Sequence, residues 1–124
     1  MQTWLIFRLK IPGFHQWSDA PKKYEYLKNL HRHEFYIQVE IRVDENRGYE
    51  FIEMKSDFHI WLLQNLGDYT YKDSIYLDER IKKQSVEGLA EYIIKYITET
   101  YNHKGVKVTV EEDHENGARV EYWP

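Results

Sequence analysis

Residues 33 to 43 alternate strictly between apolar and polar side chains, and this run constrains the fold more than any other part of the chain. One side of the run carries His33, Phe35, Ile37, Val39, Ile41 and Val43, and the other carries Glu34, Tyr36, Gln38, Glu40 and Arg42. A period of two is typical of a β-strand with one buried face. The sequence therefore predicts a strand from Arg32 to Asp44 that lays its apolar face on a core.

Two histidines at the start of this strand lie on its apolar side. His31 and His33 are two residues apart, so both imidazoles are expected to point inward, and His15 follows Gly13 and Phe14 in a predicted loop that can fold back over the strand. A buried imidazole needs a partner for each ring nitrogen, and a metal ion satisfies several rings at once. Three neutral nitrogens with an open fourth position are the ligand set of a catalytic zinc. The alternative is a hydrogen-bonded core histidine, with the pair arising by chance among six histidines.

Composition limits the classes of protein that fit. At 124 residues the chain is expected to form one domain, residues 1–124, with oligomerisation as a supplement to a small core. A net charge of −4 argues against a non-specific nucleic-acid binder. The absence of cysteine excludes disulfides and thiolate chemistry, and no apolar stretch approaches the roughly 18 residues of a membrane span. We expect a soluble, cytoplasmic protein without a nucleic-acid or membrane partner.

The remaining periodicities predict a mixed α+β chain. A first strand is expected from Thr3 to Ile11, ended by Pro12-Gly13, and a return strand from Tyr49 to Met54 after the turn-forming residues Asp44 to Gly48. Helical spacing follows from Phe58 to Leu66 with Gly67 as C-cap, and again after Ser85 as N-cap. A last hairpin begins at Val106, turns at Asn116-Gly117 and closes from Ala118 to Trp123.

Glu112 is the second candidate site residue. It has the same parity as Val106, Val108 and Val110 and so falls on their apolar face, whereas Glu111 falls on the other face. A carboxylate at the end of an apolar face either frays into solvent or has a partner. In a half-buried pocket it can accept two hydrogen bonds from the edge of an amino-pyrimidinone ring.

Several of these segments resemble the 6-pyruvoyl-tetrahydropterin synthase and 6-carboxy-tetrahydropterin synthase family. The family has a lone histidine after the first strand and a His-Gly-His-Asn-Tyr-like run opening the second. Here these are Gly13-Phe14-His15 and Leu30-His31-Arg32-His33-Glu34-Phe35-Tyr36. In the family a glycine precedes a strand with an acidic residue that leads into the first helix, and Gly48 to Met54 matches this loosely. Before its second helix the family has a Pro-Thr-Ser-Glu-x-Leu-Ala segment, and Ser85 to Ile93 resembles it without the proline. Glu112, or less closely Glu111, matches a glutamate that holds the pterin edge.

The resemblance implies a T-fold: an antiparallel sheet of two hairpins with two helices on one face, assembled into an oligomeric barrel, most simply a homohexamer. It implies Zn²⁺ held by His15, His31 and His33, and a ligand contacted by Glu112 and Glu87. The implied ligand is a pterin or a deazapurine-type nucleotide precursor, as in queuosine biosynthesis.

The chain departs from the family where the family places its proton-transfer groups. The catalytic cysteine before the His-x-His pair is missing, with Leu27 as the nearest equivalent, and the Leu-Asp-His motif between the helices reads Leu66-Gly67-Asp68-Tyr69. Each loss is expected to cost on the order of 10²- to 10⁴-fold in rate. The substitute bases that the sequence offers are Tyr24, Tyr26, Asp68 and Tyr69.

Two functions are therefore open. The chain is either a zinc-dependent carbon–oxygen lyase of the tetrahydropterin synthase type with a non-cysteine base, or a non-catalytic protein that binds or sequesters a purine- or pterin-like molecule. A cupin barrel also opens its metal motif with His-x-His. Ile37 and Gln38 stand where the cupin glutamate belongs, so the cupin reading is the weakest.

Overall fold

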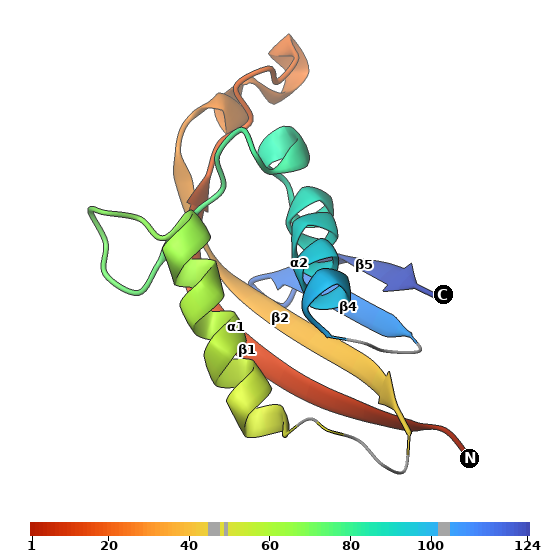
Figure 1. The fold of residues 1–124 in the computed structure, drawn as a ribbon. Coiled ribbons are helices and arrows are strands. Elements are labelled where there is room, and N and C mark those ends of the chain that lie inside the picture. Colours follow the sequence, from red (N-terminus) through yellow and green to blue (C-terminus); the bar gives the residue numbers. More distant parts are fainter. Residues whose placement is uncertain (45–47, 49, 102–104) are drawn as a thin grey trace.

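The computed structural model describes residues 1–44, 48, 50–101 and 105–124 and contains one five-stranded sheet in the order β3-β1-β2-β4-β5 (Figure 1). The long strands β1 (Thr3–His15) and β2 (His31–Val43) form an antiparallel pair, and so do β4 (Val106–Glu112) and β5 (Asn116–Tyr122). β2 and β4 join the two pairs, while the short β3 (Ile75–Tyr76) lies parallel to the end of β1.

Both α-helices cover the same face of this sheet (Figure 1). α1 (Phe51–Leu66) places Met54, Phe58, Leu62 and Leu66 on the core, and α2 (Val86–Thr100) contributes Leu89, Ala90, Ile93 and Ile97. The sheet supplies the alternating residues expected from the sequence, among them Phe35, Ile37, Val39 and Ile41 at no more than 1% exposure. The architecture is the α+β arrangement of two antiparallel strand pairs under two helices.

The expected return strand from Tyr49 to Met54 is wrong for the residues the structure describes, since Phe51 already begins α1. Tyr49 itself lies outside the described residues. The side chain of Glu50 accepts a hydrogen bond from the N–H of Glu53 at 2.9 Å and so caps the helix. Phe51 and Ile52 stay exposed, because the helical spacing of Met54 and Phe58 decides which side of the segment is buried.

Two strand boundaries also differ from expectation. β1 does not stop at Pro12-Gly13 but continues to His15, since Pro12 lies in a strand near the sheet edge, where proline is tolerated. Gly13 permits this because a Cβ there would collide with the Phe35 ring. The last hairpin turns at residues 113–115 rather than at Asn116-Gly117, with Asp113 and His114 in the left-handed region at φ of 52° and 60°.

Other expectations are confirmed. Gly67 ends α1 with its N–H bonded to the carbonyl of Leu63, and the Ser85 hydroxyl caps α2 by accepting from the N–H of Gly88 at 3.1 Å. Two short 3₁₀ segments, η1 (Lys22–Lys28) and η2 (Lys82–Gln84), lie in stretches where the sequence predicts no regular element. Among the described helices, none is long and apolar enough to span a membrane.

Candidate metal centre

The three candidate histidines meet at the end of the β1–β2 pair, on the face of the sheet that the helices cover. His15 pairs directly with His31 in the sheet register, and His33 follows two residues later on the same face. The ring centroid of His15 lies 4.3 Å from that of His31 and 4.9 Å from that of His33. His15 thus reaches the cluster from a strand rather than from the loop that the sequence predicts.

Each of the three rings uses Nδ1 for a bond to the protein. The His15 Nδ1 lies 2.8 Å from the carbonyl oxygen of Gln84, and the His31 Nδ1 lies 2.7 Å from that of Asn29. The His33 Nδ1 lies 2.6 Å from Oδ2 of Asp113. A neutral imidazole with Nδ1–H donating in this way presents a free lone pair on Nε2, and such bonds are the usual support of metal-binding histidines.

The free nitrogens fit a metal ion. One ligand atom from each histidine lies within 4.8 Å of the other two, and the buried Nε2 of His15 has no hydrogen-bond partner. A buried polar atom without a partner is uncommon in a folded protein. Three imidazole nitrogens this close together, on oriented rings, form a donor set suited to Zn²⁺.

Burial keeps His15 in the form that binds a metal. It lowers the pKa of His15 from 6.5 to about 4, against the opposing effect of the Gln84 carbonyl, and the nearby His31 and His33 add to the lowering. The ring is therefore neutral at pH 7, with its nitrogen lone pair available without loss of a proton.

Asp113 holds the His33 ring in place. The sequence patterns do not identify this residue as part of the site. Its second oxygen, Oδ1, accepts from the backbone N–H of Glu34 at 2.8 Å, so the residue joins the β4–β5 turn to β2. The hydrogen bond from His33 is the main cause that lowers the pKa of Asp113. Its position directly after Glu112 at the end of a predicted strand could have indicated a site residue. Its contact with His33 depends on the pairing of β2 with β4, which the sequence does not reveal.

A pocket of about 360 Å³ adjoins the cluster, and its walls include His15, His31, Trp17, Leu27, Glu87 and Glu112. The structure thus brings both predicted ligand-binding glutamates to the predicted metal ligands. Burial raises the pKa of Glu112, whereas hydrogen bonds to its own backbone N–H and to Ser85 lower that of Glu87. Leu27, which stands nearest to the missing family cysteine, also lines this pocket.

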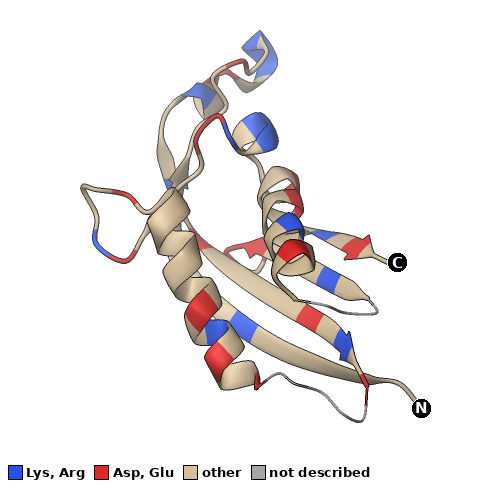
Figure 2. Cartoon of the chain, viewed as in Figure 1, with Lys and Arg blue, Asp and Glu red and all other residues tan. Residues whose placement is uncertain are grey.

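Basic residues gather around this end of an otherwise acidic chain (Figure 2). η1 carries Lys22, Lys23 and Lys28, and η2 carries Lys82 and Lys83. Lys83 also lines the pocket. Cationic side chains at the mouth of a half-buried site favour an anionic ligand.

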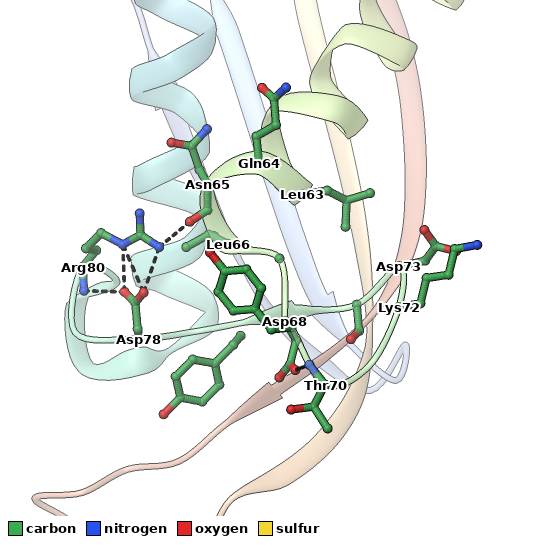
Figure 3. A pocket seen from close by; sticks show the side chains of 14 residues that line it. Leu63, Gln64, Asn65, Leu66, Asp68, Thr70, Lys72, Asp73, Asp78 and Arg80 are labelled. Atoms are coloured by element: carbon green, nitrogen blue, oxygen red, sulfur yellow. Dashed lines mark hydrogen bonds and ion pairs between the residues drawn. The ribbon is translucent and has the colours of Figure 1, made fainter.

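The four candidate bases are not gathered at the histidines. Tyr24 stacks on Trp17 with ring centroids 6.0 Å apart, and Tyr26 is 68% exposed. Asp68 and Tyr69 line a different, larger pocket beside the end of α1, which is drawn in Figure 3. There the Asp68 carboxylate accepts from the N–H groups of Thr70 and Tyr71, a local role in shaping the turn.

Comparison with known proteins defines the class of fold. The chain is similar to the structure of Caenorhabditis elegans 6-pyruvoyl tetrahydropterin synthase, with 22% identity over 98% of this chain and 96% of that one and a TM-score of 0.67. It is also similar to the Plasmodium falciparum 6-pyruvoyl tetrahydropterin synthase, with 14% identity, 99% of each chain covered and a TM-score of 0.59. An uncharacterized protein of Wolinella succinogenes gives 9% identity, coverage of 97% and 98%, and a TM-score of 0.63.

The chain therefore has the T-fold of these synthases. No protein-family model matches the sequence, and no curated protein does. One further similar structure is a Plasmodium vivax 6-pyruvoyltetrahydropterin synthase in which a catalytic glutamate is replaced by cysteine, with 16% identity and a TM-score of 0.57.

Proposed function

We propose that the chain is a zinc-binding protein of the 6-pyruvoyl/6-carboxy-tetrahydropterin synthase type that acts on a pterin or deazapurine-type nucleotide precursor. The observation that carries the proposal is the cluster of three histidine rings, each of which has its Nδ1 bonded to a protein acceptor. His15, His31 and His33 would hold the ion, whose chemistry when bound is Lewis-acid polarisation of ligand oxygens.

The pocket residues support a ring-bearing, anionic ligand. Glu112 lies at the inner wall, where a carboxylate can accept hydrogen bonds from an amino-pyrimidinone edge. Trp17 offers an aromatic wall beside it. Lys83 lies at the same pocket and would meet a phosphate carried by a nucleotide precursor.

A catalytic role does not require cysteine in this fold, since a glutamate is called catalytic in the Plasmodium vivax synthase. In this chain the half-buried carboxylate of Glu112 lies 3.7 Å from His15 and 3.8 Å from His33 and lines the pocket, so it is a candidate acid–base group. Tyr24, Tyr26, Asp68 and Tyr69 remain proposals as catalytic groups.

The second candidate function is a non-catalytic receptor for a purine- or pterin-like molecule. It is favoured by the separation of Asp68 and Tyr69 from the histidine pocket within the described chain and by the exposure of Tyr26. Turnover of dihydroneopterin triphosphate by the zinc-loaded protein supports the enzyme. Tight binding of the same compound without turnover supports the receptor.

The metal assignment is tested by elemental analysis of the purified protein. We expect about one equivalent of zinc per chain, and loss of that zinc in His31→Ala and in His33→Ala because each variant removes one of the three nitrogen ligands. His59 on α1 is the matched control, since it lies outside the cluster and His59→Ala is expected to keep the metal. Full metal content in a His31→Ala/His33→Ala double variant would contradict the assignment.

A further inference from the structure

Glu112 faces the same point as the free nitrogens of the histidines. It is the last residue of β4 and pairs with Phe35 of the neighbouring strand β2. Its side chain continues the inward-facing row of Val106, Val108 and Val110. Its side chain is 23% exposed. Its Oε1 lies 3.7 Å from Nε2 of His15 and its Oε2 lies 3.8 Å from Nε2 of His33.

Hydrogen bonding does not account for this position. Both distances exceed the usual range of a hydrogen bond, and among the described residues no donor is hydrogen-bonded to the Glu112 carboxylate. A half-buried carboxylate without a hydrogen-bond donor is unfavourable unless another group satisfies it.

The distances match those between two ligands of one ion. Zinc–nitrogen and zinc–oxygen bonds are about 2.0–2.1 Å long, so two donor atoms on one tetrahedral ion lie about 3.3 Å apart. The two contacts of Glu112 are within about half an ångström of that spacing, and they involve two of the three histidines at once.

We infer that the Glu112 carboxylate is a fourth protein ligand of the ion held by His15, His31 and His33 in the ligand-free protein, and that it leaves the ion to hold the ring of the small molecule when the pocket fills. The inference rests on the proposed function and deepens it. A pterin-like ligand would then supply the oxygen donors that replace the carboxylate.

The backbone around Glu112 is built to hold the carboxylate in place. Asp113, the next residue, binds both the His33 ring and the N–H of Glu34, and its φ of 52° turns the chain immediately after Glu112. Glu112 also accepts from the N–H of Glu115 through its carbonyl at 2.9 Å. The backbone on the C-terminal side of Glu112 is therefore fixed, so the inferred exchange requires movement of its side chain alone.

The inference is tested with zinc and cobalt as probes, in the wild type and in Glu112→Gln. We expect Glu112→Gln to lower zinc affinity by at least about tenfold in competition with a chelator. We also expect it to alter the visible absorption of the cobalt-loaded protein, since that absorption reports ligand type and geometry. Glu111→Gln is the matched control, because its side chain is on the opposite face of the same strand and is 43% exposed.

A second measurement follows the exchange of ligands. Adding biopterin to cobalt-loaded wild type is expected to shift the absorption toward that of Glu112→Gln, and adding it to Glu112→Gln is expected to shift it much less. Glu112→Asp, which keeps the charge but shortens the reach, should fall between wild type and Glu112→Gln in zinc affinity.

The outcomes separate this inference from the proposed function. If the wild type binds zinc through its histidines while Glu112→Gln, correctly folded by circular dichroism, keeps both wild-type affinity and the wild-type cobalt spectrum, the inference is overturned and the zinc site stands. If the wild type takes up no zinc or cobalt, both are overturned.

Discussion

At the scale of single residues, the site depends on three imidazole rings that hydrogen bonds to the protein orient before a metal binds. Each ring is fixed by one acceptor, the carbonyls of Gln84 and Asn29 and the carboxylate of Asp113. Ordering these side chains in the folded protein removes an entropic cost that a ligand would otherwise have to offset. The three acceptors come from three different segments, so the site exists only when all of them are in place.

The buried state of His15 predicts how the metal-free protein responds to acid. Its pKa is about 4 in the folded chain against 6.5 for a free ring, so between these values the unfolded chain binds a proton that the folded chain does not. The free energy of unfolding should therefore fall as the pH drops from 6.5 to 4, by up to about 3 kcal/mol, with no further loss from this group below pH 4.

Urea unfolding of the metal-free protein at pH 7 and at pH 4.5 measures this loss. His15→Leu is the comparison, since it removes the titrating ring and should lose less stability over the same interval. Parallel losses in the wild type and in His15→Leu would show that His15 does not titrate as its burial requires.

At the scale of elements, η2 connects the packing of α2 to the histidine cluster. Lys83 and Gln84 adopt left-handed backbone angles with φ of 55° and 49°, which orient the Gln84 carbonyl toward His15. η2 lies directly on Gly88 in the first turn of α2, where an added Cβ would collide with the carbonyl of Lys82. Left-handed backbone at two non-glycine residues persists only where surrounding contacts hold it.

Gly88→Ala should therefore weaken both the fold and the site. We expect a loss of about 1–3 kcal/mol from overpacking against η2, larger than the gain of about 1 kcal/mol in helix propensity. Zinc affinity should fall as well, because a displaced η2 carries the Gln84 carbonyl away from His15.

Chemical unfolding and chelator competition measure the two effects of Gly88→Ala. Gly48→Ala is the control, since nothing lies within 4 Å of the added Cβ, and it should change stability by less than about 0.5 kcal/mol. Wild-type zinc affinity in Gly88→Ala would mean that η2 does not position His15.

At the scale of the whole molecule, β1 and β5 are the long strands nearest to the two sides of the sheet, with only the two-residue β3 beyond β1 among the described strands. In this part of the chain β1 pairs with β2 along its length and with β3 at Gly13 and Phe14, and β5 pairs with β4. Unpaired edges of long strands associate readily. Joining β1 of one copy to β5 of the next would continue the sheet, and repeating this step would close a barrel with the helices outside.

We therefore expect a homo-oligomer, most simply a hexamer of two stacked rings. Light scattering at micromolar concentration measures the mass. Ile6→Lys, on the face of β1 away from the helices where the isoleucine is 40% exposed, should weaken assembly because it places a charge beside the neighbouring strand.

Ile52→Lys is the matched control for assembly, because Ile52 is 68% exposed and lies on α1 rather than on a strand of the sheet. A monomer at micromolar concentration in the wild type would contradict the barrel. Equal masses for Ile6→Lys and the wild type would instead place the interface elsewhere.

The sequence by itself determined the central strand and much of the site. The alternation after His33 specified which face is buried, since a strand's side chains point alternately to its two faces, and parity placed Glu112 on the inner face. Ser85 and Gly67 marked helix ends correctly because capping depends on local chemistry. Parity and capping are local properties, so they can be read without knowing what packs where.

Only the tertiary structure decided the rest. Whether residues 51 to 54 form strand or helix depends on the burial of Met54 and Phe58 against the sheet, which a short apolar run does not reveal. His15 reaches its partners because β1 runs on past Pro12-Gly13 in register with β2. The acceptors Asp113 and Gln84 come from segments distant in sequence, and only strand pairing and the strained turn of η2 bring them to the histidines.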